Sequence, residues 1–153
     1  MKNVIRTIAI ALVLGVVVPA AQAQTGKPVT IVDANTVSAG ELAKLPNMTP
    51  DLAKAVIAKR PFKTIKDLDN ALSGLTKEQR TELYGKLFVP INLNTATDEE
   101  ILLIPGVGNR MLREFKEYRP YEALSKFHRE IAKYVDEKEL ARLEQYVSVP
   151  VAK

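Results

Sequence analysis

Residues 94–121 read NTATDEEILLIPGVGNRMLREFKEYRPY, and this stretch decides the fold. Thr97 has the chemistry of a helix N-cap and Glu100 completes a capping box three residues later, so a short helix is expected to begin there. Pro105 ends it, because the residue before a proline is disfavoured in the helical region. A second helix is expected to follow at once, with its apolar positions at Met111, Leu112, Phe115 and Tyr118, and to end at Arg119-Pro120.

The turn between these two helices has a glycine on each side of Val107. Gly106 and Gly108 can take a positive φ at little steric cost, and they leave the backbone amides uncovered. The free N–H groups and the positive dipole end of the next helix point the same way, which suits a phosphate oxygen. Val107 can anchor the turn in the core, while Arg110 and Arg113 can reach flanking phosphates.

The same pattern occurs twice in the chain. Residues 35–68 align with residues 94–127 without a gap, and the apolar positions agree throughout. The identical pairs are Asn35/Asn94, Thr36/Thr95, Glu41/Glu100, Pro46/Pro105, Arg60/Arg119 and Pro61/Pro120. The sequence therefore predicts two tandem copies, residues 30–90 and 91–151.

The pattern predicts an all-α fold. Ser38 matches Thr97 as an N-cap, and further helices are expected to start near Thr64 and Ala123 and again after Thr76 and Asp136. No segment alternates with period two, so we expect eight to ten short helices and no substantial sheet. The five tyrosines are expected to pack in or beside the core rather than to stack on bases.

These motifs together resemble the helix-hairpin-helix module, and more closely the small exported proteins of the ComEA type, which are linked to DNA uptake and competence. The resemblance rests on the lead-in Asn94-Thr95-Ala96, the capped acidic helix, the Pro-Gly-Val-Gly turn and the apolar helix that ends in Tyr-Arg-Pro-Tyr. It implies sequence-independent binding to DNA, either double- or single-stranded. The residues implied as DNA-binding are Gly106, Val107, Gly108, Asn109, Arg110 and Arg113.

The first copy departs from this family pattern. Asn47 and Thr49 stand where the family has glycines; asparagine tolerates a positive φ, but a β-branched threonine does not do so readily. Two later hairpins, at residues 74–76 and 134–136, also lack one or both glycines. We therefore expect only a secondary DNA contact from the first copy, through Asn47, Thr49 and Lys54.

The N-terminus has the features of a secretory signal peptide. Lys2 and Arg6 precede an apolar run at residues 8–18, and Ala21-Gln22-Ala23 is a small-x-small cleavage site. This predicts a signal peptide at residues 1–23, cleavage before Gln24, and a periplasmic or otherwise extracytoplasmic protein that is not integral to the membrane. The alternative is an uncleaved anchor, for which the apolar run is short.

Composition argues against an enzyme. The chain has no cysteine and a single histidine, His128, which excludes thiolate chemistry and leaves one candidate base. We expect no catalytic residue, no metal and no cofactor. Loss of Lys2 and Arg6 lowers the count of Lys and Arg from 22 to 20 against 18 acids, so any nucleic-acid role must rest on local patches.

Two functional hypotheses remain open at this point. The basic residues gather at residues 44–66 and 105–129, around the hairpins, which favours a protein that grips DNA phosphates; the same residues are also what solvated faces of short helices would show. The alternative is an envelope structural or protein-interaction module that keeps the fold and has lost DNA binding. The near-neutral mature charge and the three altered hairpins favour this second hypothesis.

Overall fold

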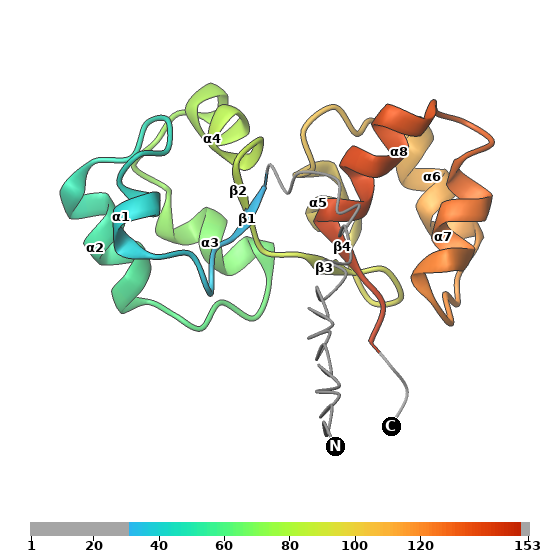
Figure 1. Cartoon of the computed structure of the whole chain (residues 1–153), viewed down its shortest axis with the longest axis horizontal. Helices are drawn as coiled ribbons and strands as arrows, with labels where there is room; N and C mark the ends of the chain where they lie inside the picture. The colour runs from blue at the N-terminus through green and yellow to red at the C-terminus, as the bar shows by residue number, and fades with distance from the viewer. Residues whose placement is uncertain (1–30, 151–153) are drawn as a thin grey trace, which may run out of the picture.

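A computed structural model describes residues 31–150; the predicted signal peptide lies outside them. The described part is all-α, as predicted, with eight short helices in two halves (Figure 1). The first half contains β1 (Val32–Asp33), α1 (Ala39–Leu42), α2 (Pro50–Ala58), α3 (Ile65–Ala71), α4 (Lys77–Tyr84) and β2 (Leu87–Phe88). The second contains β3 (Ile91–Asn92), α5 (Asp98–Leu102), α6 (Asn109–Glu117), α7 (Leu124–Ile131), α8 (Glu137–Leu143), a 3-10 turn η1 (Glu144–Tyr146) and β4 (Val147–Ser148).

The helices begin where the sequence predicted. Ser38, Thr64, Thr76 and Thr97 each form a complete capping box, in which the cap hydroxyl accepts from an amide and the acid or glutamine reaches back. Glu100, which accepts from the Thr97 N–H, is the buried member of these four boxes. These capped starts fix the register of the apolar faces that α1, α3, α4 and α5 turn to the core.

Two short parallel strand pairs were not predicted. β1 pairs with β2 and β3 with β4, so the first and last residues of each half are joined by backbone hydrogen bonds. Two residues are too few to show a period-two pattern, so these strands carry no strand signal in the sequence. Each pair closes its half into a compact unit.

The Asn and Arg pairs that are identical in the two halves have structural roles. The Asn94 side chain accepts from the Tyr121 N–H at 2.6 Å and donates to the Tyr121 carbonyl at 2.8 Å. Asn35 makes the same pair of bonds with Phe62. Arg119 donates to the Ala96 carbonyl at 2.8 Å, so this arginine holds the loop and is not available to a ligand.

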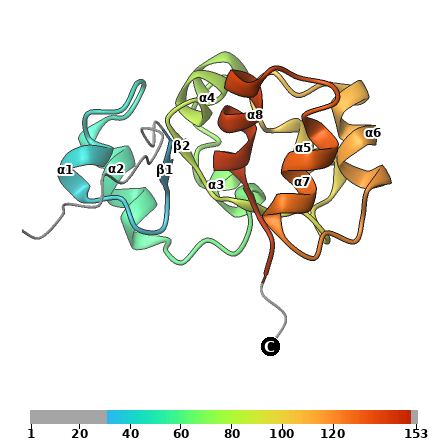
Figure 2. The ribbon, with the colours of Figure 1, turned by 45° about the vertical axis from the view of Figure 1, so that its right-hand side comes forward.

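The two halves lie side by side (Figures 1 and 2), and three aromatic rings, Tyr84, Phe88 and Tyr146, form an aromatic joint between them. The Phe88 ring stands edge-on to Tyr84 at 5.8 Å and to Tyr146 at 4.8 Å, so it links α4 to the last turn of the second half. The Tyr146 hydroxyl donates to the Tyr84 carbonyl across the joint at 3.1 Å. Tyr121 is also buried, and Tyr118 and Tyr134 are half-buried with their hydroxyls 2.7 Å apart, as expected for packing roles.

Membrane insertion has no support in the described helices. Within residues 31–150 no helix combines the length and hydropathy needed to cross a bilayer.

Candidate nucleic-acid interface

The turn between α5 and α6 uses its two glycines for different purposes. Gly106 has φ +81, a conformation that favours glycine, as predicted. Gly108 does not have a positive φ; its backbone is extended at φ −112 and ψ −177, so the expectation that both glycines serve the left-handed region is wrong. Val107 is buried and anchors the turn between them.

Gly108 is the N-cap residue of α6, and it has no side chain that could accept a hydrogen bond from the helix amides. No side chain of the described residues accepts from the first-turn amides of α6, and a Cβ at Gly108 would meet no atom within 4 Å. Gly106, Gly108, Asn109 and Arg110 are exposed. The N–H groups that a helix cannot satisfy internally therefore face solvent here, together with the positive end of the helix dipole.

Two unpaired arginines flank this helix start. Arg110 and Arg113 are exposed on the face opposite the buried Leu112 and Phe115, and neither has an acidic partner among residues 31–150. The other basic side chains of residues 105–129 are already engaged: Lys116 with Asp98, Arg119 with Ala96, Lys126 with Pro120 and Arg129 with Glu130. Arg110 and Arg113 are thus the basic side chains of this segment that make neither a hydrogen bond nor an ion pair, and both lie beside the turn.

Arg142 on α8 also lies against the turn, a position that was not predicted from the sequence. Its guanidinium is 3.4 Å from the position that a Cβ on Gly106 would occupy. It makes two 2.7 Å hydrogen bonds to the Glu139 carboxylate, which lower the pKa of Glu139 below its ordinary value. The residue of the first half that aligns with Arg142 is Glu82. The charge at this position is therefore opposite in the two halves, and only a comparison of the halves reveals it.

The equivalent turn of the first half has the same backbone but a closed helix start. Asn47 takes the left-handed conformation at φ 59, and Thr49 is an extended N-cap at φ −88, so the turn does not need the positive φ that a threonine resists. The Thr49 hydroxyl accepts from the Leu52 N–H at 3.2 Å. Pro50 has no N–H to offer, and Asp51 places a carboxylate in the first turn of α2.

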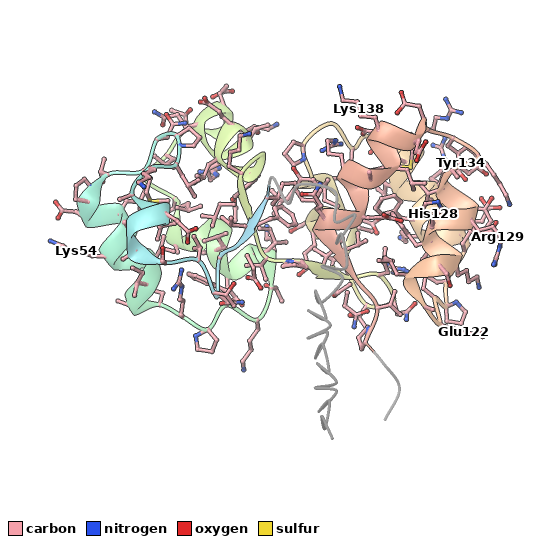
Figure 3. The ribbon with its side chains drawn as sticks, in the orientation of Figure 1. Lys54, Glu122, His128, Arg129, Tyr134 and Lys138 are labelled. Carbon is pink, nitrogen blue, oxygen red and sulfur yellow. The ribbon has the colours of Figure 1, made fainter. Side chains whose placement is uncertain are left out.

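The remaining predicted residues of the first half are also engaged. The Asn47 amide donates to the Glu82 carboxylate at 2.9 Å, and Lys54 lies 3.8 Å from Asp51. Lys54 points outward at the end of the first half away from α6 (Figure 3). The structure therefore does not bring Asn47, Thr49 and Lys54 together with the α5–α6 turn.

The two later hairpins have capped helix starts as well. The Thr76 hydroxyl accepts from the Gln79 N–H, and the Asp136 carboxylate accepts from the Glu139 N–H. Among the four hairpin turns of residues 31–150, the α5–α6 turn alone leaves its helix start without a side-chain cap.

The histidine and the acidic side chains of residues 31–150 lie apart from one another or in surface contacts. His128 is exposed and its Nδ1 lies 2.6 Å from Glu144, a surface contact. Within residues 31–150, no three His, Asp or Glu side chains are grouped to hold a metal ion.

Comparison with known proteins places a motif on the first half. Neither the curated proteins nor the solved structures gave a match to this chain. The match to a family model ends at residue 88, before the α5–α6 turn begins. Residues 28–88 match the helix-hairpin-helix motif, and within that range the structure has the helices α1 to α4.

Proposed function

We propose that this is an exported, non-enzymatic protein that grips the DNA backbone, without reading sequence, through the α5–α6 turn. One observation carries the proposal: α6 begins at a bare glycine cap, with two unpaired arginines beside it. The helix-hairpin-helix motif of residues 28–88 supports it, because this motif commonly binds nucleic acid. We further propose that residues 91–151 are a second copy of the motif, that the protein is of the ComEA type, and that it serves DNA uptake.

The geometry suggests how a phosphate would be held. The exposed amides of the turn and of the first turn of α6 donate to one phosphate oxygen, and the dipole of α6 favours the negative charge. Arg110 and Arg113 then contact the flanking phosphates. Contacts to phosphate carry no sequence information, so affinity should depend on salt and not on base composition.

Replacing Arg113 with alanine should weaken binding equally on all DNA sequences. The loss of one phosphate contact should flatten the dependence of log K on log salt by about one ion. Fluorescence titrations of two unrelated duplexes over a salt series measure this. Arg129→Ala is the matched control, because Arg129 is exposed but paired with Glu130. Equal slopes for the wild type and Arg113→Ala would argue against the contact.

Export makes a separate prediction about the mature chain. The short apolar run and the Ala21-Gln22-Ala23 site predict a released protein that begins at Gln24. N-terminal sequencing or intact mass of the protein from the extracytoplasmic fraction would measure this. A membrane-bound protein that keeps Met1 would overturn the export proposal while leaving DNA binding to be judged independently.

The second candidate function is an envelope structural or protein-interaction module. It is favoured by the three hairpins whose helix starts are occupied by Thr49, Thr76 and Asp136. This candidate predicts no measurable DNA binding even at low salt, and its partners would be envelope or DNA-uptake proteins.

A further inference from the structure

A cleft separates α4 of the first half from the α5–α6 turn of the second. It has a volume of about 230 Å³ and is lined on one side by Lys77, Arg80 and Thr81. These three residues lie on one face of α4 by helical spacing. The opposite side includes Leu102, Pro105 and Gly106. The proposed phosphate-binding turn therefore forms one wall of a cleft whose other wall belongs to the first half.

The opposite face of α4 is occupied by the turn of the first half. The Asn47 amide reaches the Gln79 carbonyl and the Glu82 carboxylate there. α4 thus lies between the two turns. The Glu82 carboxylate and the Gln79 carbonyl face the turn of the first half, and Lys77 and Arg80 face the α5–α6 turn. This asymmetry of α4 matches the asymmetry of the turns, because the open helix start is the one that faces the cations.

The charged residues that line the cleft are Asp69, Lys77 and Arg80, and the first and last of these are paired. Arg80 is held at 3.0 Å from Asp69 and donates to the Leu75 carbonyl, and Asp69 also accepts from the Tyr84 hydroxyl at 2.6 Å. Asp69 and Arg80 neutralise each other. Lys77 is exposed and forms no ion pair among residues 31–150, and its acidic neighbour Glu78 does not line the cleft, so the Lys77 ammonium group is the surplus charge of the cleft.

We propose that the DNA site is composite: Lys77 of α4 binds a backbone phosphate next to the one held by the α5–α6 turn, across the cleft. This rests on the proposed function and extends it, because it makes the first half part of the site although its own turn is closed. The aromatic joint at Phe88 gives the two walls a fixed separation, so both contacts are set before DNA arrives.

Replacing Lys77 with glutamate tests this in the full chain. Lys77 is the first residue of α4, where an acid interacts favourably with the helix dipole, so the fold should be kept. Reversing the charge should lower the affinity for a duplex by about tenfold at ~50 mM salt. Lys77→Ala should flatten the salt dependence by about one ion.

Lys63→Glu is the matched control. Lys63 is exposed and lies just before the cap of α3, much as Lys77 follows the cap of α4, and it does not line the cleft. Equal losses for Lys77→Glu and Lys63→Glu would overturn the composite site alone, provided that the wild type binds and Gly108→Thr binds at least tenfold more weakly. Absence of binding by the wild type would overturn both this inference and the proposed function.

Discussion

Replacing Gly108 with threonine should lower the affinity for DNA by tenfold or more while leaving the fold intact. Threonine at this position would copy Thr49, whose hydroxyl accepts from an amide of its helix, and would close the start of α6. The space is open, since a Cβ there meets no atom within 4 Å. Charge-assisted hydrogen bonds contribute about 1.5–3 kcal/mol each, and 1.4 kcal/mol is a factor of ten.

Stability and binding must be measured on the same variant. Threonine and glycine are similar as N-caps, so the free energy of unfolding should change by less than about 0.5 kcal/mol. The reciprocal variant Thr49→Gly is the control: it opens α2, but Pro50 and Asp51 remain, so affinity should not rise. Undiminished binding by a folded Gly108→Thr protein would contradict the role of the α6 amides.

The double variant Gly106→Val and Gly108→Val should have a larger effect than Gly108→Thr. Valine at position 106 would be strained at φ +81 and would press on Arg142, whereas valine at position 108 covers the amides without strain. Binding should be abolished, and circular dichroism should show that the helices persist. Comparable changes at Asn47 and Thr49 should do less.

Replacing Phe88 with alanine should destabilise the protein by about 3–5 kcal/mol, the range for a fully buried phenylalanine. Phe88 packs on aromatic rings from both halves, so we expect its loss to weaken both. Urea unfolding gives the free energy, and amide hydrogen exchange in α2 and α6 shows where protection falls. Phe127→Ala, whose ring packs on Phe115 and Tyr121 within the second half, is the comparison. If the Phe88→Ala protein lost amide protection in only one of its halves, the proposed joint between the halves would be contradicted.

The helices could be predicted from the sequence because their signals are local. A cap residue such as Ser38 and its partner Glu41 are three positions apart, and apolar spacing reports the buried face without tertiary information. The two-residue strands lacked such a signal, since they pair residues distant in the chain.

The candidate site was only partly predictable for a related reason. The glycines marked the turn, but backbone conformation separated Gly106, which needs a positive φ, from Gly108, which serves as a bare cap. Arg142 of α8 lies against the turn and Lys77 of α4 lines the cleft beside it, and nothing in their local sequence indicates either position. Thr49 was misjudged because a threonine N-cap and a strained glycine replacement look alike in sequence.

A low-salt titration of the mature protein with a fluorescent duplex and a fluorescent single strand tests the central claim most directly. The account predicts weak binding that is indifferent to sequence and falls steeply as salt increases, because phosphate contacts release counterions. Non-specific binding usually lies between about 10⁻⁴ and 10⁻⁶ M. No binding at ~50 mM salt and roughly tens of micromolar protein would contradict the proposed DNA binding and favour the second candidate function, a structural or protein-interaction module.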